Sequence, residues 1–224
     1  MKIGAQQKLA VLLALILLSV PVRALASEPL ELLKSAAERV IVVLKDPRLK
    51  AAERKKERVE QLKAIINPIF DYEEVARRTL AAHWRRRSAA EQEEFTKLFR
   101  AFLEKIYSDR IGLYEGEHVV FGQETVDQEY AEVEAKLISL KDEESRVLYR
   151  LKRSNGKWKV YDAVVENISI VNNYRSQFDR VISKSSFDEL KRMLREKAGV
   201  RIFRTSRACA EVDRVSKDKL GNRR

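Results

Sequence analysis

The 224-residue sequence predicts an α+β domain in which helices precede and follow an antiparallel sheet. Three observations support this class. Apolar residues recur at helical spacing early in the chain, alternate strictly between about 119 and 166, and return to helical spacing after 169. The alternating segments are short and closely spaced, which favours an antiparallel meander with one wet face and one covered face. Helices and strands segregated along the chain in this way are typical of an α+β fold.

Six segments have helical periodicity, and cap residues mark where several of them begin. Asp71 and Ser186 are each followed three positions later by Glu, and Ser88 with Glu91 forms a capping box. Gly199 fits a helix end. Helices are expected over residues 29–44, 48–66, 71–84, 88–107, 169–183 and 186–199.

The sheet is predicted from four segments with a period of two. They cover residues 119–121, 131–137, 146–152 and 157–166. Between the last two lies the pair Asn155-Gly156, which accepts the positive φ angles of a type I′ turn and therefore predicts a two-residue hairpin.

The first 26 residues have the layout of a cleavable secretory signal. Lys2 and Lys8 precede an apolar run over residues 9–18, and a small-x-small triplet ends at Ala26. The run is too short for a comfortable membrane span, and no cysteine lies at the cleavage point to carry a lipid anchor. We therefore expect residues 1–26 to be removed and the mature protein to be exported, with an uncleaved anchor as the alternative.

Charge and composition exclude several classes of protein. The chain has 45 Lys and Arg against 34 Asp and Glu, one Cys and two His, for a net charge of +11. Three of these positive charges lie in residues 1–26, and residues 199–224 hold a net five more, which leaves +3 for residues 27–198. We interpret 27–198 as one nearly balanced domain and 199–224 as a basic C-terminal tail, a candidate for disorder. This balance argues against a nucleic acid partner, and a lone cysteine cannot close an intrachain disulfide.

The sequence has no recognisable catalytic or metal-binding motif. His83 and His118 lie far apart, and no nucleophile motif, phosphate-binding glycine loop or calcium loop is present. We therefore assign no catalytic or metal-binding residue and expect no cofactor. A wide aromatic stripe on the helix after Ser88 is typical of a packed core and also of a wall around a hydrophobic ligand, and periodicity does not decide between them.

One run of residues carries a family resemblance. The segment Trp158–Phe178, with Tyr149-Arg150-Leu151 and Gly156-Lys157 before it, resembles the MlaC or toluene-tolerance family of periplasmic phospholipid-binding proteins. The resemblance covers about residues 30–197. Further matching positions are Phe70-Asp71, Val75-Ala76, Leu80, Trp84, Ser88, Gln92, Glu94-Phe95 and Phe99. Ala81 and Asn167 stand where many relatives have glycine.

The resemblance implies a fold and a function. The fold is a helical layer packed on a curved antiparallel sheet of four to five strands, enclosing a hydrophobic lipid cavity. The function is that of a soluble shuttle, expected as a monomer, in the periplasm of a Gram-negative bacterium. It carries glycerophospholipid between an outer-membrane lipoprotein-porin complex and an inner-membrane ABC transporter with an MCE-domain subunit, and so maintains outer-membrane lipid asymmetry.

If such a cavity exists, the apolar faces found by spacing should line it. From the long helix, the sheet and the following helix these are Phe99, Phe102, Leu103, Ile106, Val147, Tyr149, Trp158, Val160, Val171, Tyr174 and Phe178. Tyr161, Asn172 and Arg175 are candidates for headgroup contact, because an arginine at the cavity mouth pairs well with phosphate. A structural ion pair is an equal alternative for Arg175.

Three other functions stay open at this point. A relative that carries another amphipathic lipid, such as a hopanoid, would keep the same fold with a reshaped pocket. An exported enzyme with the same fold would need a buried carboxylate or histidine pair facing the cavity. A protein that binds nucleic acid or an anionic membrane would act through the basic tail.

Overall fold

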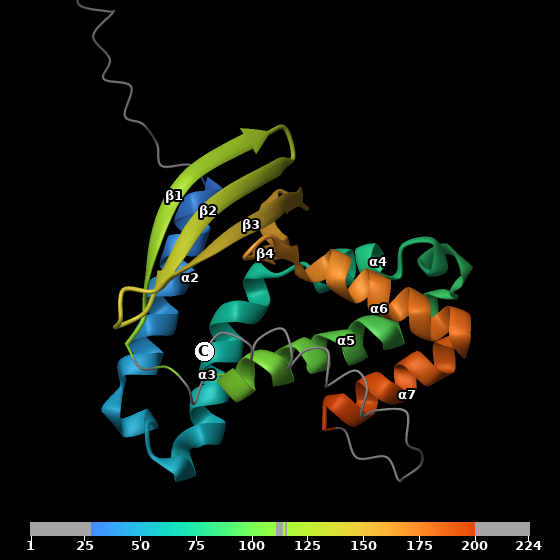
Figure 1. Cartoon of the computed structure of the whole chain (residues 1–224), viewed down its shortest axis with the longest axis horizontal. Helices are drawn as coiled ribbons and strands as arrows, with labels where there is room; N and C mark the ends of the chain where they lie inside the picture. Colours follow the sequence, from blue (N-terminus) through green and yellow to red (C-terminus); the bar gives the residue numbers. More distant parts are fainter. Residues whose placement is uncertain (1–27, 111–113, 115, 200–224) are drawn as a thin grey trace, which may run out of the picture.

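The computed structural model describes residues 28–110, 114 and 116–199, so the predicted signal segment and basic tail lie outside it. Within the described residues, five strands form one open antiparallel sheet in the order β1 to β5, and six α-helices pack around it. Figure 1 shows the sheet at one end of the molecule and the helices α4 to α7 at the other, with α2 behind the sheet. The predicted α+β class is confirmed.

The strands follow the predicted meander. They are β1 (His118–Asp127), β2 (Tyr130–Ile138), β3 (Glu144–Ser154), β4 (Lys157–Val165) and β5 (Ile168–Ser169). The predicted hairpin between β3 and β4 is confirmed, because Asn155 and Gly156 both have positive φ, at 50° and 75°. The two-residue β5 carries no periodic signal of its own, and periodicity did not predict it.

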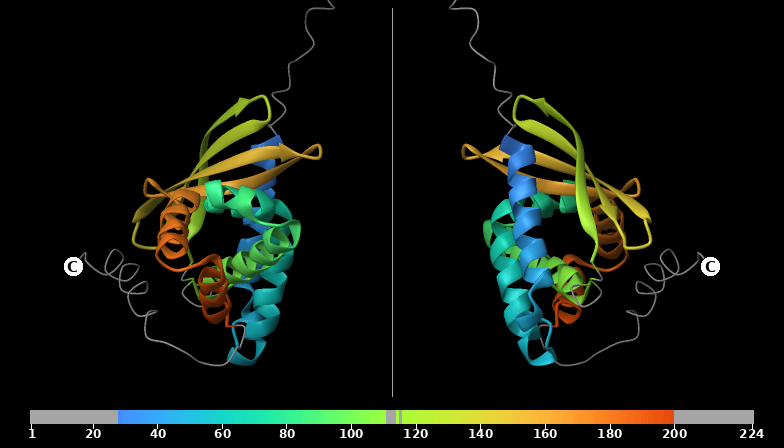
Figure 2. Two further views of the ribbon diagram at one scale, coloured as in Figure 1. Left: turned by 90° about the vertical axis from the view of Figure 1, so that its right-hand side faces the viewer. Right: turned by 90° about the vertical axis from the view of Figure 1, so that its left-hand side faces the viewer.

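The sheet is bent by two irregularities that the sequence did not predict. The β1–β2 register shifts between Phe121 and Glu124, and the β3–β4 register shifts between Arg150 and Leu151, which leaves Tyr161 as the extra residue on β4. Extra residues of this kind bend a strand and increase its twist. Figure 2 shows the resulting curvature, with β1 and β2 turning away from the plane of β3 and β4.

The helices begin largely where their caps predict. They are α2 (Glu28–Lys45), α3 (Lys55–Ile66), α4 (Tyr72–Leu80), α5 (Ala89–Arg110), α6 (Ile170–Lys184) and α7 (Phe187–Lys197). The Asp71 carboxylate accepts the backbone N–H of Glu74 at 3.0 Å. Ser88 and Glu91 bond each other's backbone N–H groups, as a capping box requires.

Two predicted helices are shorter than expected. Within the predicted segment 71–84, α4 ends at Leu80, because Ala81 has a φ of 47° and residues 81–86 form a 3₁₀ helix. The segment 48–66 was predicted as a single helix, but α3 begins only at Lys55. The residues before it form two short 3₁₀ turns, Pro47–Leu49 and Ala52–Arg54. The Asp46 carboxylate accepts the backbone N–H of Arg48 at 2.9 Å and caps the first turn in place of a continuous helix.

The buried apolar residues fall into three separate clusters. The helical core joins α4, α5, α6 and α7 around Phe95, Phe99 and Phe178. The sheet core joins Leu33 of α2 to one face of β2, β3 and β4. The hairpin core holds α2 against α3, and Figure 2 shows these two helices side by side. The helix α5 packs mainly on α4 and α7 rather than on the sheet.

Candidate functional site

One face of the sheet is largely apolar across β2, β3 and β4. In β2, buried Ala131, Val133 and Ala135 alternate with exposed residues, and they define what we call the inner face. Strand register places Tyr149 opposite Val133, and Val147 opposite Ala135, so both lie on this face. Trp158 and Val160 of β4 belong to the same buried cluster as Val133. The four sheet residues predicted to contact lipid therefore share one surface.

The inner face is covered by α2 near one end and is more exposed at the other. At the end nearest Trp158, Leu33 of α2 packs on Val133, and the backbone N–H of Leu30 donates to the Glu124 carboxylate at 3.0 Å. At the opposite end, Leu137 and Val165 are 41% and 40% exposed. An apolar surface thus continues from a buried half into an open half.

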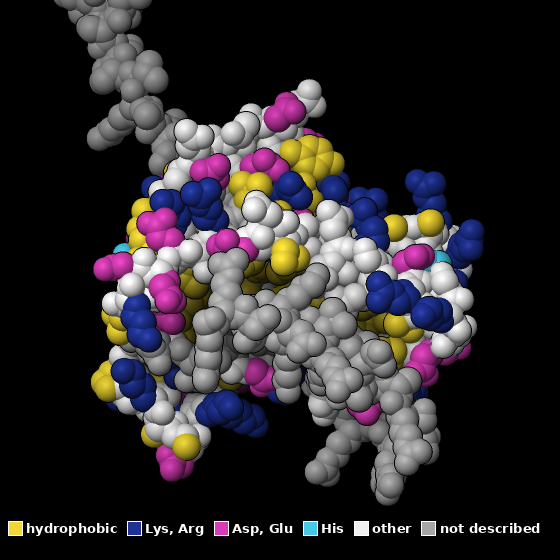
Figure 3. Space-filling view, in the orientation of Figure 1, with side chains coloured by type: hydrophobic (Ala, Val, Ile, Leu, Met, Phe, Trp, Pro, Cys, Tyr) yellow, Lys and Arg dark blue, Asp and Glu magenta, His cyan; other side chains and the backbone are white. Residues whose placement is uncertain are grey.

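Tyr149 lies where the covered half meets the open half. Its ring packs against the sheet core while the residue keeps accessible surface, and burial raises the pKa of its hydroxyl. Tyr149 is therefore a partly exposed polar side chain on an apolar face. Figure 3 shows hydrophobic side chains set back from the charged surface between the sheet and α5.

The predicted lipid contacts on the helices form a second group. Phe99, Val171 and Phe178 are buried in the helical core, where the ring centroids of Phe99 and Phe178 are 5.1 Å apart. Three further helix residues pack at the edge of this core and stay partly exposed: Leu103, Ile106 and Tyr174. The ring centroid of Phe102 lies 5.5 Å from that of Tyr174. The structure therefore places the helix residues and the sheet residues in different clusters, and their shared contact with lipid stays a prediction.

Two of the three headgroup candidates, Tyr161 and Arg175, meet at Arg78, and none of the three belongs to the sheet core. The Tyr161 ring packs against Tyr130, an outer-face residue, and lies 4.0 Å from the Arg78 guanidinium. Exposed Arg175 donates from Nε to the Arg78 carbonyl at 3.0 Å. Asn172 donates its backbone N–H to the capping hydroxyl of Ser169, and its side chain is exposed. Their role with a headgroup stays a prediction.

The family follows from comparison with known proteins. A family model described as MlaC protein matches residues 34–196, which is more than half of the chain. The chain belongs to the MlaC family.

A solved structure shares the MlaC fold described above. It is a phospholipid-binding protein from Ralstonia solanacearum in complex with a phospholipid. It is similar to this chain with a TM-score of 0.67 and 23% identity, over 75% of this chain and 96% of that one. Comparison with curated proteins gave no match.

Sequence reasoning missed part of the inner face in this MlaC chain. Ala135, Leu137 and Val165 were not proposed as contacts, although they continue the surface that carries Val147 and Tyr149. The signal was present for Ala135 and Leu137, because both belong to the alternating run in β2. Val165 required the register between β3 and β4, which the second bulge shifts.

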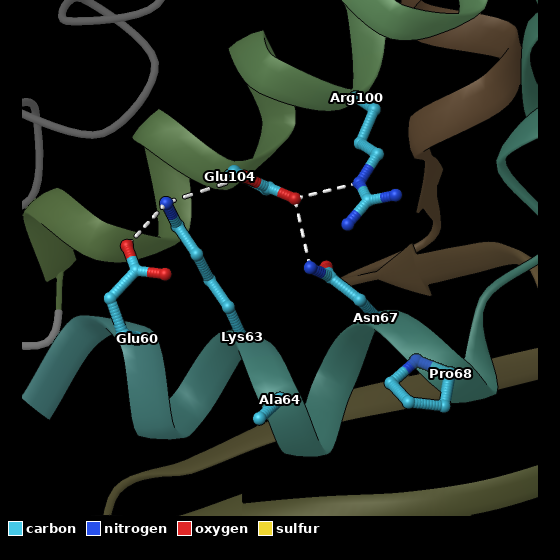
Figure 4. A pocket seen from close by; sticks show the side chains of 7 residues that line it. All are labelled: Glu60, Lys63, Ala64, Asn67, Pro68, Arg100 and Glu104. Carbon is cyan, nitrogen blue, oxygen red and sulfur yellow. Dashed lines mark hydrogen bonds and ion pairs between the residues drawn. The ribbon is translucent and has the colours of Figure 1, made fainter.

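The sequence did not predict a polar recess that the structure contains. It has a volume of about 410 Å³ between α3 and α5, and Figure 4 shows Glu104 at its centre. The Glu104 carboxylate accepts from Arg100 Nε at 2.8 Å and from Asn67 Nδ2 at 2.9 Å, and it pairs with Lys63 at 3.5 Å. Hydrogen bonding to Glu60 raises the pKa of Lys63. These charges satisfy one another, so the recess ties α3 to α5 and does not offer an apolar surface to acyl chains.

The histidines take structural positions in the MlaC fold. His83 Nε2 lies 2.8 Å from the Asp179 carboxylate and links the turn after α4 to α6, and His118 is exposed at the start of β1. Among residues 28–110, 114 and 116–199, no three His, Cys, Asp or Glu side chains converge as a metal site requires. In the same residues, no helix has the length and apolar character needed to cross a membrane.

Proposed function

We propose that this MlaC-family chain binds a glycerophospholipid against the inner face of its sheet and carries it through water. The partly uncovered inner face is the observation that carries this proposal. Leu137, Val147 and Val165 extend the sheet core into an open apolar surface, and a monomeric soluble domain rarely leaves such a surface without a ligand or partner. The phospholipid in the solved structure of the Ralstonia solanacearum protein supports the same conclusion.

The energetics explain why a carrier is needed. Burial contributes about 0.8 kcal/mol per methylene, so two acyl chains with around thirty methylenes hold on the order of 25 kcal/mol of hydrophobic free energy. Unaided transfer of a phospholipid through water is therefore very slow. An apolar surface that travels with the lipid lowers this barrier without ATP.

The transport route is part of the proposal. We infer a periplasmic shuttle of a Gram-negative bacterium, working between an outer-membrane lipoprotein-porin complex and an inner-membrane ABC transporter with an MCE-domain subunit. Family membership and the signal-like residues 1–26 support this route. Its physiological effect would be to maintain outer-membrane lipid asymmetry.

A vesicle transfer assay tests the carrier activity. Donor vesicles containing a fluorescent phospholipid are mixed with unlabelled acceptor vesicles, and the mature full chain is added. The proposal predicts transfer that accelerates in proportion to protein concentration. Transfer no faster than the spontaneous rate, with protein that is folded by circular dichroism, would contradict it.

A further inference from the structure

The Tyr149 hydroxyl has no hydrogen-bond partner among residues 28–110, 114 and 116–199. On β3 its inner-face neighbours are Val147 and Leu151, and across the sheet it faces Val133 and Ala163. All four are apolar, and the hydroxyl makes no hydrogen bond to any described residue. By contrast, the hydroxyl of Tyr72 donates to Asn67 Oδ1 at 2.8 Å. Tyr149 therefore brings a free hydrogen-bond donor to an apolar surface.

The surroundings of Tyr149 place this donor at the edge of the open half of the inner face. Its ring packs against the sheet core and the residue stays partly accessible, while burial raises the pKa of its hydroxyl. Water can satisfy the hydroxyl while no ligand is bound. When an acyl chain displaces that water, an unpaired hydroxyl weakens binding by about tenfold or more, unless the ligand brings an acceptor.

A phospholipid brings few acceptors into an apolar site. Its acyl chains have none, and the first ones above the chains are the two ester carbonyl oxygens. In a bound lipid, these esters lie where the enclosed chains end and the exposed headgroup begins. Tyr149 occupies the matching place on the sheet, between fully buried Leu151 and partly exposed Val147, with the Cα of Val147 about 7 Å nearer the open end.

We propose that the Tyr149 hydroxyl donates a hydrogen bond to an ester carbonyl of the bound lipid, which makes the site selective for ester-linked over ether-linked phospholipids. This inference rests on the proposed function and specifies its substrate class. The selectivity then depends on the linkage between the acyl chains and glycerol rather than on the headgroup. Only the hydroxyl oxygen of Tyr149 makes this hydrogen bond. A substitution that removes the hydroxyl and keeps the ring therefore tests the hydrogen bond without disturbing the packing of the ring.

The test compares two phosphatidylcholines with the same headgroup and chain length, one with ester and one with ether linkages. Each competes with a fluorescent phospholipid for the mature full chain. We expect the wild type to bind the ester lipid about tenfold more tightly. In Tyr149→Phe, which keeps the ring, no hydroxyl is left unpaired, so the ether lipid should bind about tenfold more tightly than it binds the wild type and the preference for the ester lipid should disappear. Tyr130→Phe on the outer face is the matched control and should keep the preference.

Several outcomes would overturn the inference. Equal binding of both lipids by the wild type would show that the ester carbonyl accepts no hydrogen bond that strengthens binding. An equal loss of both affinities in Tyr149→Phe would show that the hydroxyl only supports the fold, and a preference that survives the substitution would assign it to another residue. If the folded wild type binds neither lipid, the proposed function itself fails, and this inference fails with it.

Discussion

At the scale of single residues, Ala81 shows strain that glycine would relieve. It ends α4 with φ 47° and ψ −117°, a conformation that costs a residue with a Cβ about 1–3 kcal/mol. We predict that Ala81→Gly raises the free energy of unfolding by about 1 kcal/mol, measured by urea denaturation. Asn167→Gly, at φ 66°, should gain less because asparagine tolerates this region. A loss of stability in Ala81→Gly would contradict this account.

The contribution of Glu74 to the stability of the protein depends on pH. Burial alone raises the pKa of its carboxylate, but hydrogen bonds from Arg77 and Arg78 outweigh burial and hold the pKa below the ordinary value of 4.5. A carboxylate with a depressed folded pKa stabilises the protein above its unfolded pKa, and this stability is lost as pH falls through the folded value.

We therefore predict that acid unfolds Glu74→Gln with a shallower pH dependence than the wild type. Urea midpoints measured from about pH 6 to about pH 3 should fall less in the variant, which starts about 1 kcal/mol lower. Glu129→Gln removes an exposed carboxylate on the β1–β2 turn and should leave the profile unchanged. Identical slopes for Glu74→Gln and the wild type would contradict the ion-pair assignment.

At the scale of elements, the inner face predicts different effects for one substitution at two positions. Val147→Asp places a charge in the open half, where water can reach it, so we expect loss of lipid binding with destabilisation of no more than about 1–2 kcal/mol. Val133→Asp buries the charge at a site that is 0% exposed and should prevent folding. Circular dichroism and bound-lipid analysis measure both effects. Normal lipid content in Val147→Asp would place the lipid elsewhere.

Elements were predictable where short-range chemistry determines them. Asp71, Ser88 and the Asn155-Gly156 pair act through hydrogen bonds and φ angles within a few residues, and each does in the structure what its sequence predicts. The bulge at Tyr161 and the pairing of β5 depend on contacts between strands. No local pattern in the sequence encodes these contacts.

At the scale of the whole molecule, periodicity finds apolar faces but does not say which faces meet. Phe99 and Val147 carry the same kind of signal in the sequence. The structure buries Phe99 among other aromatic rings in the helical core and leaves Val147 beside the open half of the sheet. The candidate site was therefore predictable as a set of apolar residues, whereas the separation of the helical core from the inner face of the sheet required the three-dimensional packing.

The headgroup candidates illustrate the same limit. Tyr161 is the extra residue of the β4 bulge and Arg175 lies on α6, and both lie beside Arg78. No local pattern predicts that they meet there, and their contact with a headgroup stays a prediction.

The central claim is that the chain carries one glycerophospholipid, and native mass spectrometry tests it most directly. The protein is purified from the periplasm without detergent, its mass is measured, and the extracted lipid is identified. We predict a monomer with about one glycerophospholipid per chain, and an empty but folded Val147→Asp. A reproducibly empty wild type, or one that holds a hopanoid or another lipid without a phosphate, would contradict the claim.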